Sequence, residues 1–169
     1  MLRMLAEIRA LYDYSTWANG RILDTADRLG LKQFIAANGG SGSIREILVH
    51  TAWAQWTWLG RWQGAGPRPH WNAAEFPSVA SLRARWKGVE EETHDFLAGL
   101  EEDDLQRVFS YVNSRGETWR YPLWQALLHQ ANHATQHRSE AALLLTQCGS
   151  SPGDLDFLIY VDEHGASRG

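Results

Sequence analysis

Four segments of this 169-residue chain repeat apolar residues at intervals of three and four positions, which is the period of a helix that buries one face. These segments cover residues 2–29, 44–62, 79–100 and 122–148. Each has room for about five helical turns or more, and helices of that length bury their apolar faces by packing on one another. We therefore predict an all-α fold, a four-helix bundle. The pattern leaves open whether the topology is up-and-down or contains a crossover connection.

Residues at the ends of the segments support the predicted helices. Ser43 and Glu46 have the spacing of a capping box at the start of the second helix, and Ser78 is a candidate N-cap of the third. Pro122 suits the first turn of the fourth helix, because it lacks an N–H that would be unpaired there. Gly149 follows this helix as its expected C′ residue.

The period changes between the third and fourth helices. VFSYV and ETWRY alternate in hydropathy and flank the turn-like tetrapeptide NSRG, so we predict a short β-hairpin between residues 108 and 121, inserted before the last long helix. The tail from Ser150 joins the turn-forming SSPGD to the apolar LDFLIYV. We predict that it packs on the bundle as an extension and ends in a loose GASRG.

Composition narrows the class of protein. The size fits one domain, residues 1–169, and a net charge of -4 without a run of Lys or Arg argues against nucleic acid as a partner. The N-terminal segment has no signal-peptide pattern and no apolar run could span a bilayer, so we expect a cytoplasmic protein with no membrane partner. Cys148 is the single cysteine, which excludes an intramolecular disulfide and cysteine-based zinc fingers. A metal ion would have to be held by nitrogen and oxygen.

The fourth helix contains HQANHATQH, in which His129, His133 and His137 recur every fourth residue on the predicted core-facing stripe. His129 and His137 are about 12 Å apart along the helix axis, whereas ligands of one ion are about 3 Å apart. One ion can therefore take an adjacent pair but not all three. His50, on the core stripe of the second helix, is the natural third ligand. The spacing alone fits a metal site and a hydrogen-bonded polar stripe in the core about equally well.

Other chemistry has weaker support. HQANH imitates the metalloprotease pattern HExxH, but Gln130 cannot act as the general base that the pattern requires. We interpret His70, His94 and His164 as solvated residues and Cys148 as a small buried hydrophobe. Nine tryptophans, four of them between residues 53 and 62, mainly fill the core in this interpretation, with some at an edge or interface.

The chain resembles the DinB family of four-helix-bundle metalloproteins over nearly its whole length. The resemblance rests on LYDYSTWANGRIL, SIREILVHTAWAQWTWLGRW, LLHQANHATQHRSEAALLL and SSPGDLDFLIY, of which NHATQHR is the most specific. It implies a homodimer that binds a divalent metal ion, Ni²⁺ or Zn²⁺, through His50, His133 and His137, with His129 as a neighbour. Gln55 stands where many relatives have an acidic residue.

The resemblance also implies a type of activity. The characterised proteins that this chain resembles look like thiol-dependent transferases and isomerases, which use bacillithiol, mycothiol or glutathione. We therefore expect a metal-dependent transferase or hydrolase in which the ion activates a low-molecular-weight thiol or water against a small-molecule substrate. Tryptophan and tyrosine residues near the bundle mouth would shape its pocket. The alternative is a non-catalytic, stress-responsive bundle whose ion holds the second and fourth helices together.

Overall fold

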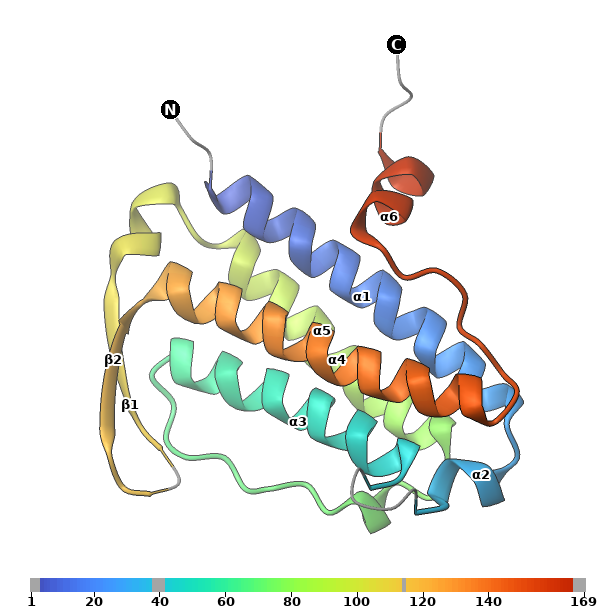
Figure 1. Ribbon diagram of the computed structural model, residues 1–169. Coiled ribbons are helices and arrows are strands. Elements are labelled where there is room, and N and C mark those ends of the chain that lie inside the picture. The colour runs from blue at the N-terminus through green and yellow to red at the C-terminus, as the bar shows by residue number, and fades with distance from the viewer. Residues whose placement is uncertain (1–3, 38–41, 114, 166–169) are drawn as a thin grey trace.

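The computed structural model describes residues 4–37, 42–113 and 115–165 (Figure 1). Its four long helices are the predicted ones: α1 (Met4–Arg28), α3 (Ile44–Trp62), α4 (Val79–Ala98) and α5 (Leu123–Gln147). The protein is therefore an all-α bundle with a hairpin insertion, as the apolar period predicts. No helix in the described ranges has the length and hydropathy needed to cross a membrane.

The order of the helices resolves the topology that the sequence leaves open. Figure 1 shows α3 and α4 running in the same direction, antiparallel to α1 and α5. The connection at residues 63–78 returns along the length of the bundle and contains a short 3-10 helix, η2 (Ala73–Glu75). This connection is the crossover. The link between α1 and α3 contains a further short helix, α2 (Leu31–Ile35), which the sequence pattern did not predict.

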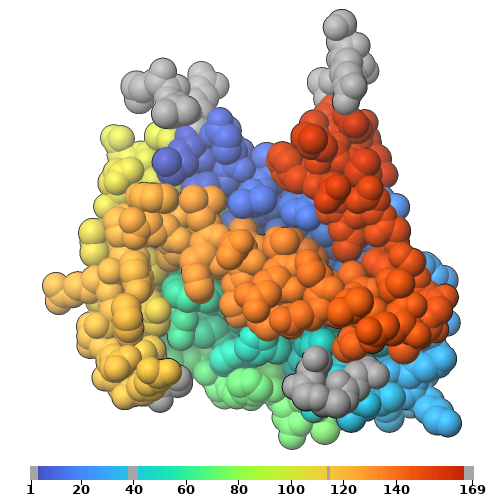
Figure 2. Space-filling view, viewed as in Figure 1, coloured from blue at the N-terminus to red at the C-terminus, as the bar shows by residue number. Residues whose placement is uncertain are grey.

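The core consists of two hydrophobic clusters, one toward each end of the bundle. One joins the C-terminal half of α1 to the starts of α3 and α4 and the end of α5, and the other joins the opposite ends. Ile8, Ala18 and Ile22 on the predicted stripe of α1 are at most 1% exposed, which confirms the inward face. In Figure 2, α5 covers the middle of the visible face, with α1 above it and α3 below. Helix α5 is thus packed between the two helices that flank it.

The predicted helix ends are confirmed, with one shift. Ser43 and Glu46 form the capping box of α3, and Ser78 accepts a hydrogen bond from the backbone N–H of Ser81. Pro122 is the N-cap of α5 and not a residue of its first turn. Gly149 has φ 81° at the C′ position, where the left-handed conformation suits glycine.

The hairpin lies at one end of the bundle, beside the C-terminus of α3 (Figure 1). Strands β1 (Val108–Val112) and β2 (Thr118–Pro122) pair antiparallel, with Tyr111 opposite Trp119. A 3-10 helix, η3 (Glu102–Gln106), precedes them. The predicted NSRG turn includes residue 114, which lies outside the described residues.

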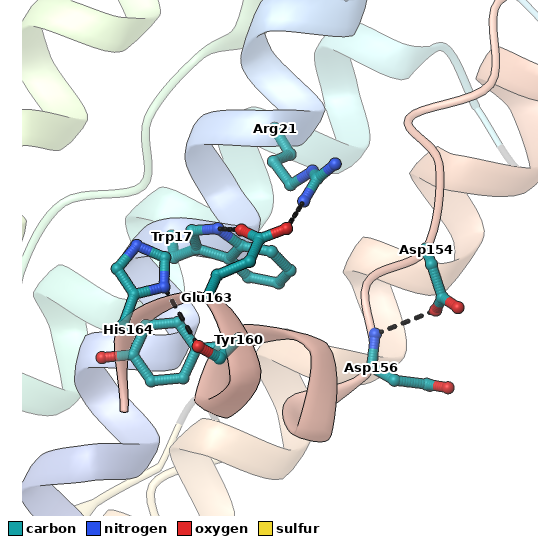
Figure 3. Close-up of polar contacts among 7 residues, drawn as sticks. All are labelled: Trp17, Arg21, Asp154, Asp156, Tyr160, Glu163 and His164. Carbon is teal, nitrogen blue, oxygen red and sulfur yellow. Dashed lines mark hydrogen bonds and ion pairs between the residues drawn. The ribbon is translucent and has the colours of Figure 1, made fainter. Parts of the chain in front are cut away.

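The tail packs on the bundle as predicted, but it contains a helix, α6 (Phe157–His164), that we did not predict. Figure 3 shows Glu163 accepting a hydrogen bond from Trp17 Nε1 at 3.0 Å and pairing with Arg21 at 3.1 Å. The ring of Tyr14 contacts that of Phe157 edge-on, with centroids 5.4 Å apart. No residue of α6 is buried, so polar and aromatic contacts with α1 hold it in place. The predicted loose end falls mostly on residues 166–169, outside the described residues.

Candidate metal centre

Three histidines from two helices meet where α3 packs against α5. His50 comes from α3, and His133 and His137 lie one turn apart on α5. Each offers a ring nitrogen, and these nitrogens all lie within 4.8 Å of one another. The Nε2 atoms of His133 and His137 are 3.2 Å apart, close to the separation of two ligands of one ion. The structure therefore brings together the three histidines that the sequence and the resemblance indicate.

The surroundings of His133 test whether these residues fit a cation. Its Nδ1 is buried and has no hydrogen-bond partner among the residues that the structure describes. This atom stays unpaired whether a hydrogen bond or an ion joins the two Nε2 atoms of His133 and His137, so the fit rests on the donor set itself. Three half-buried imidazoles with converging nitrogens are a donor set that Zn²⁺ and Ni²⁺ prefer. The residues fit a divalent metal ion.

A carboxylate on α5 fixes the orientation of His137. The Nδ1–H of His137 donates to Glu140 Oε2 at 2.7 Å, which leaves the Nε2 lone pair facing His133. Such an acceptor behind a ligand histidine sets the tautomer and increases the basicity of the ring. Glu140 was not among the site residues predicted from the sequence. The signal available was its position three residues after His137, on the same helix face.

Burial and the neighbouring rings favour the neutral form of two of these histidines. Burial, followed by the like charge of His137, lowers the pKa of His133 to about 4. The same two causes, in the same order, lower the pKa of His50. Neutral imidazole is the form that binds metal ions, because its lone pair is free.

His129 lies outside the group, as the resemblance implies. It is exposed, and its ring contacts Trp58 at a centroid distance of 5.0 Å. Gln55 also points elsewhere: it accepts from Trp86 Nε1 at 2.9 Å and donates to Thr93 Oγ1 at 3.2 Å. Gln55 therefore connects α3 to α4 in the core and takes no part in the histidine group.

The remaining histidines differ in their surroundings. His70 and His164 are exposed, as predicted, although each contacts an aromatic ring. His94 is not fully solvated: it is half-buried, lies 3.0 Å from Thr16 Oγ1 and pairs with Asp13 at 3.4 Å. Its position on α4, facing α1, accounts for the difference from the prediction.

The histidine group opens to the surface. His50 and His137 line one pocket of about 310 Å³ with Glu46 and Glu140, and His50 also lines a second of about 370 Å³ with His70 and Trp71. Within the described part of the chain, no fourth His, Cys, Asp or Glu joins the three ligand atoms. An ion held there would keep coordination positions for an outside molecule, as catalytic sites do.

Comparison with known proteins agrees with this geometry. The model of the DinB family matches residues 1–167 of the 169-residue chain. No curated protein sequence matches the chain at a significant level. The match extends over almost the whole chain, so this protein belongs to the DinB family.

Proposed function

We propose that this DinB-family protein is a metal-dependent enzyme of the thiol-dependent transferase or isomerase type, with His50, His133 and His137 as its metal ligands. The observation that carries the proposal is the convergence of three half-buried ring nitrogens within 4.8 Å at an open surface site. A divalent ion there, Zn²⁺ or Ni²⁺, would lower the pKa of a thiol or of water enough for either to act as a nucleophile at neutral pH. Homodimerisation and the identity of the thiol stay predictions of the resemblance.

The residues around the histidines have separate roles in this proposal. Glu140 orients His137, and the ring of Trp53 contacts those of His50 and His70, with centroids 5.7 and 4.4 Å away. Trp53 therefore adds an aromatic contact to the His50 ligand. The pockets beside His50 and His137 have room for a small molecule.

A purely structural ion is the less favoured alternative. Residues of α3 and α5 already belong to both hydrophobic clusters, so their packing does not need a metal cross-link. A structural site is also closed by a fourth ligand as a rule, and the described residues supply only three.

The activity of the enzyme should depend on the metal ion. We expect turnover of electrophilic substrates with a panel of small thiols to vanish on chelation, and to return when Zn²⁺ or Ni²⁺ is added to wild type but not to His133→Ala. His129→Ala is the matched control, because it removes a histidine one turn away and should retain activity. Activity that survives complete removal of the metal would refute the proposal, and metal binding without any turnover across the panel would favour the structural alternative.

Replacing Glu140 with glutamine should weaken metal binding by about 10-fold, because an acceptor behind a ligand histidine contributes 10- to 100-fold and this side chain is 43% exposed. Competition with a chromogenic chelator measures the affinity. Glu91→Gln, at an exposed position on α4, is the control for loss of one negative charge. Equal affinities in the two variants would mean that Glu140 does not support the ligand set.

A further inference from the structure

A third pocket, of about 400 Å³, lies beyond Trp53 at the hairpin end of the bundle, between α3, the loop at residues 64–68 and β1. Its lining includes two arginines and, among the described residues, no Asp or Glu. The chain as a whole has a net charge of -4, so the positive charge is local to this pocket. The polar and aromatic side chains of the lining include Trp53, Thr57, Arg61, Arg68 and Tyr111.

Arg61 lies over two adjoining aromatic rings and pairs with no carboxylate among the described residues. Its guanidinium lies 4.5 Å from the ring centroid of Trp58 and 4.2 Å from that of Tyr111. No ion pair to Arg61 occurs among the residues that the structure describes, although the group is half-buried. Stacking on two rings fixes the guanidinium in place, while its N–H donors keep the capacity to bind an anion.

The backbone of α3 makes room for the second arginine. Arg68 lies over the ring of Trp56 at 4.3 Å, and a Cβ atom on Gly60 would clash with its Nε. Burial lowers the pKa of Arg68 against the opposing negative charge of Glu92, and no ion pair joins Arg68 to Glu92 in the described structure. Gly60 thus allows Arg68 to lie flat against the helix at the pocket wall.

Thr57 is the second kind of evidence for a ligand. It is 8% exposed, and its Oγ1 is buried and has no hydrogen-bond partner among the described residues. Because Thr57 precedes Arg61 by one helical turn and lines the same pocket, its hydroxyl can donate to a group held by that arginine. An unpaired buried hydroxyl beside two unpaired cations is typical of a site completed by a ligand.

We infer that this pocket binds a small organic anion, with its carboxylate or phosphate group on Arg61, Arg68 and the hydroxyl of Thr57, and its planar apolar part against Trp53 and Tyr111. The inference goes beyond the proposed function, because anion binding here requires no metal ion. The ring of Trp53 also contacts that of His50, and Arg61 lies about 16 Å from His50 along the axis of α3. A long substrate could therefore occupy both sites at once.

Isothermal titration calorimetry of the full-length protein with 2-naphthoate tests the inference. We expect binding at least about 10-fold tighter than that of the neutral 2-naphthamide, and the same affinity in metal-stripped protein and in His133→Ala. Arg61→Gln should lose about 10-fold or more, whereas Arg61→Lys should retain part of the affinity. Lys32→Gln, which removes an exposed positive charge from α2 at the far end of the bundle, should change it less than about twofold.

Gly60→Ala tests the same site without removing a charge, because the added Cβ atom displaces Arg68. This variant should bind 2-naphthoate more weakly than wild type. Circular dichroism of Gly60→Ala and of Arg61→Lys checks that both variants stay folded. Inorganic phosphate separates the sources of the anion: competition with 2-naphthoate supports a shared anion subsite. If phosphate binds and 2-naphthoate does not, the inference that the ligand is an organic anion would be overturned. Equal affinity for 2-naphthoate and 2-naphthamide would overturn the anion site itself. So would an unchanged affinity for 2-naphthoate in both Arg61→Gln and Gly60→Ala.

Discussion

Replacing His133 with alanine is expected to lower the affinity of the protein for Zn²⁺ or Ni²⁺ by at least about 100-fold, since loss of a supporting acceptor alone costs 10- to 100-fold. His133 supplies one of the three converging rings: it lies 5.4 Å from the ring of His50 and 4.5 Å from that of His137. Without it, two histidines on different helices remain, and neither has a second ligand one turn away. Elemental analysis of tag-free protein and competition titration measure the loss.

His129→Ala is the matched control for this experiment, because the residue lies one turn from His133 on the same helix but outside the ligand group. It should retain the metal content of wild type, whereas His50→Ala should lose it as His133→Ala does. Equal metal content in all four proteins would refute the assignment. Loss in His129→Ala with retention in His137→Ala would move the ligand pair up one turn.

The fold was predictable because each level of the sequence pattern indicates the same structure. Ile8 and Ile22 recur at helical spacing and are buried, and Ser43 with Glu46 marks the start of α3 by a local hydrogen-bond pattern. The hairpin follows from alternation within a few residues. These features depend on the spacing of residues within short segments, so they can be inferred from a single sequence.

Part of the histidine group was equally local. His133 and His137 share a face at a spacing of four residues, so helix geometry brings their rings together. The choice between metal ligands and a hydrogen-bonded stripe depended on the partner from α3. The apolar stripe made His50 the candidate, and the family resemblance implied that it is a ligand. Glu140 was missed because a glutamate on a partly exposed helix position is common and has no pattern of its own.

Contacts between distant segments could not be predicted. Helix α6 is held by Trp17 and Arg21 of α1, about 140 residues earlier, and its own sequence indicates only an apolar extension. Arg138 is 2% exposed, which sequence reasoning does not expect of an arginine. Its partner Asn19 lies 119 positions away, and only the packing of α1 on α5 brings the two together.

Arg138 and Glu90 form a buried polar network through Asn19. Asn19 donates to Glu90 Oε1 at 2.9 Å and accepts from Arg138 Nη1 at 3.3 Å, while Arg138 Nη2 donates to Thr135 at 2.8 Å. Burial raises the pKa of Glu90 from 4.5 to about 7, against the opposing effects of Asn19 and Arg138. Between those two pH values the folded protein keeps a proton that the unfolded chain has lost. The contribution of Glu90 to the free energy of unfolding therefore falls as pH rises from about 4.5 to 7.

Replacing Arg138 with methionine should lower the free energy of unfolding by about 2 to 3 kcal/mol at pH 8, because the carboxylate of Glu90 then loses the nearby cation that favours its charged form. At pH 5 the loss should be about 1 to 2 kcal/mol, since Glu90 is protonated in the folded protein and the loss comes from the hydrogen bonds to Asn19 and Thr135 and the contact with the ring of Tyr14. The difference is at most about 1.4 kcal/mol, because pH 8 lies one unit above the pKa of Glu90. Urea unfolding at both pH values measures the difference. Adding Glu90→Gln to the Arg138→Met variant should remove most of the extra loss at pH 8, because a neutral side chain needs no cation. A loss of equal size at both pH values would mean that Arg138 stabilises the bundle through packing and hydrogen bonds, and not through its charge beside Glu90.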